Sequence, residues 1–176
     1  MPYVKNYAPG GWQNDIPGAT PIAAANLNNL ETQYDEAYAD IPRRVRKTAD
    51  QTINNSEVLV NVTDLVLPVG ANEIWEFFLL IRNISVSDTP DMDIAFTIPV
   101  AGSLVCAFGV SNIAETDGTA EVDISATTVN WIKRFNYIYI GGANAGNVQL
   151  QWAQATARAN DTVMKAGSFI IGYKLG

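Results

Sequence analysis

The chain has 176 residues, of which 48% are hydrophobic, and a formal net charge of −7. This length suits one domain with an appendage, and the hydrophobic content predicts a packed core rather than general disorder. The sequence holds no histidine and one cysteine, Cys106, which excludes an intrachain disulfide, a thiolate zinc cluster and a Ser-His-Asp triad. No run approaches 18 apolar residues and no secretion signal is visible, so we expect cytoplasmic synthesis and no membrane insertion.

The acidic excess is confined to residues 48–176, which carry six basic and thirteen acidic side chains, whereas residues 1–47 carry five of each. An acidic domain repels phosphate backbones, so we do not expect nucleic-acid binding. The one basic run is RRVRK, from Arg43 to Lys47. It is interpreted either as a patch for an anionic partner or as a solvated junction that complements the dipole of a preceding helix.

Residues 1–19 are predicted to form an extended anchoring arm. Six prolines and glycines interrupt this segment and disfavour regular structure. Large apolar side chains nevertheless recur between them, whereas a free linker is usually polar. We therefore expect the arm to lie on a partner surface, or alternatively on its own domain, through Tyr3, Tyr7, Trp12 and Ile16.

Residues 20–42 are predicted to form a single helix that mediates oligomerisation. Thr20 suits the N-cap, Pro21 suits the first helical position, and Pro42 disfavours helix at the residue before it. A heptad seam runs along the helix with spacings of four and three residues. A lone helix of this length is marginal in water, so the seam must be buried on the β-domain or in a short parallel bundle, which the narrow stripe favours. The seam consists of Ala23, Leu27, Leu30, Tyr34, Ala37 and Ile41.

After a junction at residues 43–52, residues 53–176 are predicted to form an antiparallel β-sandwich, jelly-roll-like in topology. The hydrophobic period changes to two, and turn-forming residues separate the apolar runs. In the run 91–100, for example, Met92, Ile94, Phe96 and Ile98 fall on one face. The expected strands are 57–69, 73–85, 91–100, 103–110, 121–129, 135–142, 147–155 and 167–175.

No motif predicts catalysis, a cofactor or a dedicated metal site. Cys106 lies in an apolar strand, where cysteines are usually inert core residues. Asp88, Asp91 and Asp93 could supply oxygen ligands to calcium, but they lack the glycine and bidentate glutamate of a dedicated loop, which favours a solvated turn. The glycine-rich segment 141–146 lacks a lysine and opens no helix, so it is predicted to be a hairpin turn. The protein is therefore expected not to be an enzyme.

The N-terminal stretch GWQNDIPGATPIAAANLNNLETQYDEA resembles a motif common at the N-termini of tailed-bacteriophage virion proteins. In those proteins a tryptophan and an aspartate precede Thr-Pro-Ile, an Ala-Ala-Asn-Leu-Asn segment and a glutamate. The matching positions in this sequence are Trp12, Asp15, Thr20, Pro21, Ile22, Ala24, Ala25, Asn26, Leu27, Asn28 and Glu31.

The C-terminal stretch LQWAQATARANDTVMKAGSFIIGYKL is similar to the end of phage β-sandwich structural proteins. There a Trp-Ala-Gln strand precedes a turn and a Gly-Ser final strand, matched here by Trp152, Ala153, Gln154, Gly167 and Ser168. The resemblance covers both ends of the chain and implies a homotrimeric virion structural protein with an N-terminal anchor and an outward β-domain.

Two positions on the virion are open under this resemblance. In the first, which the absence of a shaft favours, the protein is a capsid decoration or head-fibre protein bound to the major capsid protein or another virion protein. In the second it is a tail or baseplate protein that recognises a host surface glycan. A sugar-binding module is a further alternative.

Overall fold

A computed structural model describes residues 24–39, 41–85, 90–108, 111–115, 122–124 and 131–176. Contacts divide the chain into two compact units, residues 1–41 and 42–176. In the first unit, helix α1 (Ala24–Ala39) is described. It falls within the predicted helix 20–42, whose first four residues lie outside the described part.

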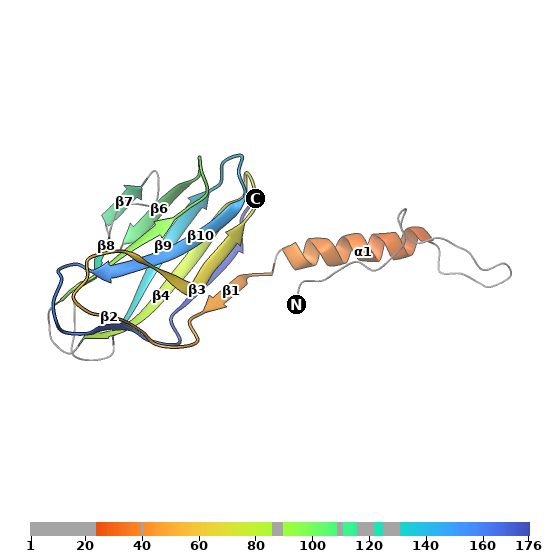
Figure 1. The fold of residues 1–176 in the computed structure, drawn as a ribbon. Helices are drawn as coiled ribbons and strands as arrows, with labels where there is room; N and C mark the ends of the chain where they lie inside the picture. The colour runs from red at the N-terminus through yellow and green to blue at the C-terminus, as the bar shows by residue number, and fades with distance from the viewer. Residues whose placement is uncertain (1–23, 40, 86–89, 109–110, 116–121, 125–130) are drawn as a thin grey trace. The chain divides into compact units, whose positions relative to one another are not determined.

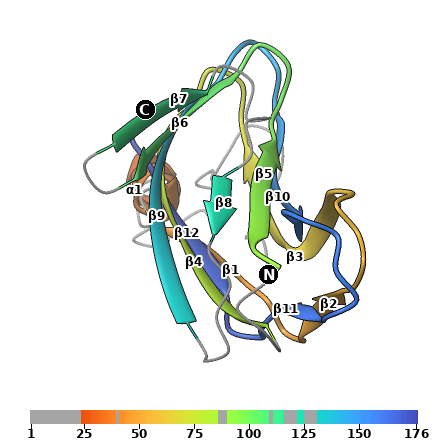
Figure 2. The same ribbon diagram turned by 90° about the vertical axis from the view of Figure 1, so that its left-hand side faces the viewer.

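The second unit is an antiparallel β-sandwich of two sheets (Figures 1 and 2). The eight-stranded sheet has the order β1-β12-β4-β9-β6-β7, with β11 paired to β4 and β2 paired to β11. The four-stranded sheet has the order β3-β10-β5-β8. Bounds of the first six strands are β1 Arg43–Arg46, β2 Gln51–Ile53, β3 Val60–Val69, β4 Ile74–Ser85, β5 Met92–Thr97 and β6 Ser103–Phe108. Those of the last six are β7 Ser111–Glu115, β8 Val122–Ile124, β9 Trp131–Ile140, β10 Gly146–Gln154, β11 Thr162–Met164 and β12 Phe169–Lys174.

The strand order is that of a jelly roll. From β3 to β10 the chain crosses between the two sheets at nearly every connection, so neighbours in sequence seldom pair. The first strand, β1, instead pairs with the last, β12, and Arg43 lies opposite Gly172. This arrangement confirms the predicted jelly-roll-like sandwich.

The core lies between the sheets because the strands turn alternate apolar side chains inward. Trp75, Phe77, Leu79 and Ile81 of β4 are all buried. Phe77 stacks on Tyr137 with ring centroids 5.0 Å apart, and Phe96 of the other sheet meets Tyr137 edge-on at 4.9 Å. These three rings join the two sheets in geometries that favour aromatic pairs.

The predicted strands correspond to β3, β4, β5, β6, β8, β9, β10 and β12. Met92, Ile94 and Phe96 share the core face as expected, and Ile98 packs against the core just beyond β5. Four strands were missed, namely β1, β2, β7 and β11. They have only three to five residues each, which is too short for a period-two pattern to stand out.

The sandwich begins earlier than its predicted boundary at residue 53. The expected junction 43–52 contains β1 and the start of β2, so the basic run forms an edge strand rather than a solvated connection. Arg43 donates a hydrogen bond to the Pro68 carbonyl of the opposite sheet, and its guanidinium carbon lies 4.8 Å from the centre of the Trp75 ring. Lys47 is buried and donates to Gln51 Oε1 at 3.0 Å.

The glycine-rich segment 141–146 is not a hairpin turn, because it connects β9 of one sheet to β10 of the other. Gly141 N donates to the Glu73 carbonyl at 2.8 Å, and Asn72 N donates to the Gly142 carbonyl at 2.7 Å. A Cβ on Gly142 would lie 2.5 Å from the Ala101 carbonyl oxygen. Glycines are needed here because backbones approach each other closely.

Replacing Leu67 tests the core assignment. Leu67 is fully buried on β3, whereas its neighbour Val66 faces outward and is half-buried. We expect Leu67→Ala to lower the free energy of unfolding by about 2–5 kcal/mol, because it removes buried methyl groups and leaves a cavity. Urea denaturation at matched protein concentration would measure this loss. Val66→Ala is the control, and an equal loss in both variants would contradict the assigned inward and outward sides of β3.

Candidate interaction surface

The outer side of the eight-stranded sheet is apolar although no part of the described sandwich covers it. Here we define this surface as the apolar face. Five of the nine large hydrophobic side chains that the described sandwich exposes project from it, and Ile132 is the most exposed of them at 62%. The apolar face consists of Ile74, Phe78, Leu80, Ile132, Ile138, Ile140, Phe169, Ile171 and Tyr173.

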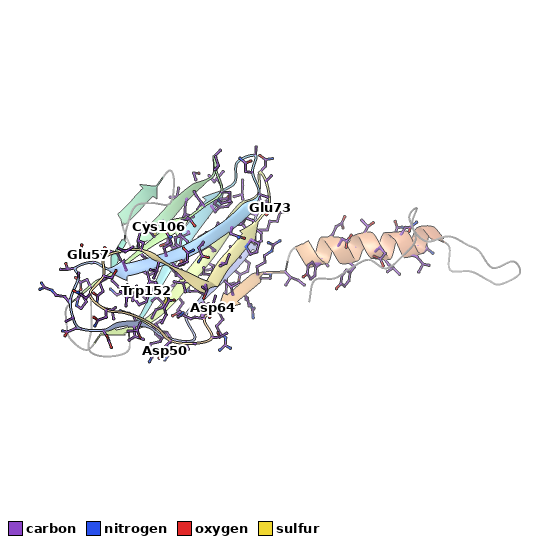
Figure 3. The ribbon with its side chains drawn as sticks, in the orientation of Figure 1. Asp50, Glu57, Asp64, Glu73, Cys106 and Trp152 are labelled. Atoms are coloured by element: carbon purple, nitrogen blue, oxygen red, sulfur yellow. The ribbon has the colours of Figure 1, made fainter. Side chains whose placement is uncertain are left out.

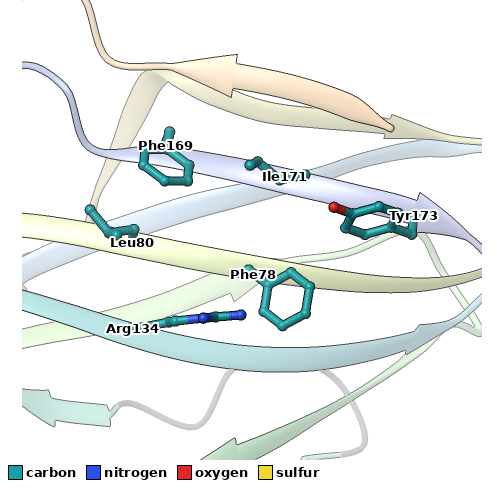
Figure 4. A pocket seen from close by; sticks show the side chains of 6 residues that line it. All are labelled: Phe78, Leu80, Arg134, Phe169, Ile171 and Tyr173. Atoms are coloured by element: carbon teal, nitrogen blue, oxygen red, sulfur yellow. The ribbon is translucent and has the colours of Figure 1, made fainter. Parts of the chain in front are cut away.

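Strand register places these side chains together. Phe78 lies opposite Ile171, and Leu80 lies opposite Phe169. They line a hollow of about 240 Å³ together with Arg134 and Tyr173 (Figure 4). A second hollow of about 210 Å³ shares Phe169 and Ile171 and is bounded by Arg44, Val45 and Arg46. The two hollows lie side by side, one over β12, β4 and β9 and the other over β1 and β12, with Phe169 and Ile171 lining both.

Arginines surround these hollows. Arg44 and Arg46 pair with Ile171 and Phe169, so their exposed side chains belong to the same side of the sheet. From β9, Arg134 places its guanidinium carbon 4.4 Å from the centre of the Phe78 ring, which is a cation–π geometry. Arg82 projects outward as well and donates to the Ala166 carbonyl at 2.8 Å.

The charge of this side is opposite to that of the rest of the sandwich. Among the described residues it carries Arg44, Arg46, Arg82 and Arg134 and a single acidic residue, Glu76. Residues 42–176 contain ten basic and thirteen acidic side chains in total. Removing those of this side leaves six basic and twelve acidic ones, so a positively charged face lies on an otherwise acidic unit.

The outer side of the four-stranded sheet is polar by contrast. Gln151 donates through Nε2 to Asn61 Oδ1 at 2.8 Å, and Gln149 donates to the Val62 carbonyl at 2.8 Å. Thr63 is exposed on the same side. The outer side of the four-stranded sheet therefore carries polar side chains suited to water. The outer side of the eight-stranded sheet instead exposes large apolar side chains of the kind that mark interaction sites.

Two carboxylates labelled in Figure 3, Asp64 and Glu73, hold neighbouring segments of the sandwich together. Asp64 accepts bonds from the backbone nitrogen and the hydroxyl of Thr48, each at 2.9 Å, and these bonds lower its pKa. Glu73 accepts from Gly70 N and, at 2.9 Å, from Trp75 Nε1, and lies 3.0 Å from Lys174 Nζ. Burial raises the pKa of Glu73, but these three partners outweigh it and the net pKa is lowered.

Helix α1 carries a second set of exposed apolar side chains. Of the predicted seam, Leu30, Tyr34 and Ile41 are 59%, 47% and 57% exposed, Leu27 is half-buried, and Ala37 is exposed. Ala23 lies outside the described residues. Tyr38 was not predicted as part of the seam, yet its ring stacks on that of Tyr34 with centroids 6.3 Å apart. The i, i+4 spacing of these tyrosines was the available signal.

Some of the other predicted site residues lie outside the described part of the chain, and the rest lie in the sandwich. The anchoring residues Tyr3, Tyr7, Trp12 and Ile16 all lie outside the described part of the chain, as does Asp88. Asp93 lies in β5, just after Asp91, and Cys106 is buried in β6. Within the described residues, no group of three His, Cys, Asp or Glu side chains is placed to hold a metal ion.

The apolar face itself was not predicted from the sequence. Its signal is the run EIWEFFLLIRNIS, in which Phe77, Phe78, Leu79, Leu80 and Ile81 are consecutive. An antiparallel strand with one side in water alternates apolar and polar residues, whereas a strand covered on both sides does not. Strand β4 therefore has the composition of a strand covered on both sides.

Comparisons with known proteins find similarity to solved structures alone. No family model matches the sequence, and no curated protein matches it. A structure of Eiger TNF from S. frugiperda is similar, with a TM-score of 0.38 and 10% identity over 77% of this chain and 92% of that one. A structure of the Gx strain of infectious bursal disease virus is similar over 77% of this chain and 41% of that one, with a TM-score of 0.25 and 11% identity. None of the described helices is long and apolar enough to cross a membrane.

The lowered pKa values predict a loss of stability in acid. Glu73 has a folded-state pKa below its ordinary value of 4.5, so its stabilising contribution is complete above that value and is lost as the pH falls through the folded-state pKa. We expect the free energy of unfolding to decrease below about pH 4.5, and Glu73→Gln to make this decrease shallower. Denaturation titrations from pH 7 to pH 3 would measure it. Glu57→Gln is the comparison, because Glu57 is exposed and accepts a backbone hydrogen bond from Ala157 N at 2.8 Å.

Proposed function

We propose that this protein is a structural subunit of a tailed-phage virion, a homotrimeric capsid decoration or head-fibre protein that docks through residues 1–19 and displays the sandwich. The observation that carries self-assembly is the apolar stripe along α1 and just beyond its end, where Leu30, Tyr34 and Ile41 are exposed. The N-terminal and C-terminal sequence motifs support the virion role.

Three copies of α1 would bury this stripe in a short parallel bundle. Its heptad spacing is that of a coiled-coil seam, and burial of each large side chain stabilises by about 1.5–3 kcal/mol. Asn, Gln, Asp and Glu side chains occupy much of the remaining helix surface, which would stay in water. An uncovered stripe of this kind is costly in an isolated chain.

The proposed role is binding rather than catalysis. The lone thiol of Cys106 is buried, so it is not available as a nucleophile. Anchoring is assigned to Tyr3, Tyr7, Trp12 and Ile16, because aromatic anchors often dominate an interface. The partner is the major capsid protein or another virion protein, and three linked arms would add avidity.

A charge in the helix seam should disrupt the trimer. Leu30→Asp would bury an unpaired carboxylate at three equivalent positions, which is strongly unfavourable. We expect light scattering to show monomers or a mass that depends strongly on concentration. Asn29→Asp adds the same charge at an exposed position outside the seam and should leave the mass unchanged. If Leu30→Asp is as stable a trimer as the parent, the bundle is wrong.

Removing the arm should abolish docking without disrupting assembly. We expect a chain lacking residues 1–19 to remain a folded trimer and to lose binding to phage particles that lack the protein. Trp12→Ala should weaken binding most among single changes in the arm, because its side chain offers the largest apolar surface. Co-sedimentation with such particles measures both effects. If the truncated trimer still binds these particles at wild-type occupancy, the anchor lies elsewhere in the chain. Counting copies on wild-type particles would decide between the head, which offers hundreds of sites, and the tail, which offers few.

A further inference from the structure

We propose that the apolar face is a contact between subunits, covered in the assembled protein by the sandwich of a second copy in a head-to-tail arrangement. This inference rests on the self-association proposed above but uses a different surface from the helix seam. The two contacts can therefore be tested separately.

The first reason is the extent of apolar surface left on one side of the sandwich. Ile132, Ile140 and Tyr173 are 62%, 46% and 39% exposed, and Phe78 and Leu80 lie between them on the same side. Ile140 lies opposite Ile74, whereas Arg134 and Asn136 separate Ile132 from Ile138 along β9. Large apolar side chains exposed on one side of a sheet mark interaction sites. The opposite outer side is polar, so the asymmetry is a property of this sheet and not of the whole unit.

The second reason is the positive charge around the apolar face, which also favours one arrangement of the two copies over the other. A two-fold contact would press this side against its own copy and oppose two sets of four arginines. A head-to-tail contact instead places the arginines against another part of the neighbouring sandwich, and the rest of residues 42–176 contains twelve acidic and six basic side chains. Complementary potentials favour the second arrangement. Head-to-tail contacts close into a ring when the rotation permits, which is compatible with a three-fold helix bundle.

The third reason is shape. Two hollows indent this side, and Phe169 and Ile171 line both of them. Such hollows accommodate a protruding loop or edge of a neighbour. Interfaces are enriched in aromatic residues and arginine at their centre, and Phe78, Tyr173 and Arg134 lie together here.

Ile171→Asp tests this contact in the full-length chain. Ile171 is half-buried on the outer side, and the variant places a carboxylate at the junction of the two hollows. We expect the concentration at which the assembly half-dissociates to rise about tenfold or more, as for a central interface residue. Thr63→Asp, on the polar outer side of β3, is the matched control and should not change it. Sedimentation velocity over a dilution series measures both variants.

A cross-linking measurement keeps the test independent of variant folding. A photoreactive benzoylphenylalanine in place of Tyr173 preserves an aromatic ring, and the same residue in place of Thr63 serves as control. We expect covalent multimers from position 173 only, with cross-linked peptides from residues 42–176 of a second copy. Cross-links only within one chain, cross-links to residues 1–41, or a parental sedimentation profile for Ile171→Asp would overturn the proposal. An effect of Leu30→Asp without one of Ile171→Asp would leave the helix bundle standing and reject this contact alone.

Discussion

The contact between the two sheets constrains every other feature of the sandwich. Phe77 and Tyr137 of one sheet and Phe96 of the other meet at ring distances of 4.9–5.6 Å, which fixes which side of each strand faces the core. Because side chains alternate along a strand, fixing the inward set also fixes the outward set. A slip of one residue in β4 would exchange Phe77 for Phe78 and turn Trp75 outward. The core thus determines which side chains form the apolar face, and contacts such as that of Arg134 with Phe78 then order them on it.

This dependence explains what the sequence could predict. The long strands follow from runs of β-branched and aromatic residues between turn formers, and Met92, Ile94 and Phe96 of β5 show the inward set directly. The β-sandwich class follows from the number of such runs without an intervening helix, whereas their spacing does not determine the jelly-roll strand order. Helix α1 follows from its heptad spacing and flanking prolines. These are local patterns, readable without knowledge of which strands pair.

The features that could not be predicted from the sequence are those that depend on residues distant in the chain. Strand β1 contains three arginines and one valine, and pairs with β12 more than 120 positions away. Nothing within RRVR indicates that Arg43 covers Trp75 while Arg44 projects from the opposite side. The segment 141–146 looked like a hairpin turn because its composition suits one, yet its close approaches are to residues 72, 73 and 101. Composition identifies a turn but not the sheets that it connects.

A helix seam and a sheet face would contribute differently to one assembly. In the proposed assembly the seam would offer a narrow stripe with heptad spacing, and this spacing would specify how many chains meet and in which direction. The sheet face offers a wider apolar area with charge opposite to that of the remaining sandwich, so it specifies which side of the neighbour is acceptable. Ring closure requires both to obey the same rotation. Because linked contacts raise each other's effective concentration, two individually modest interfaces would then hold an assembly that neither would hold alone.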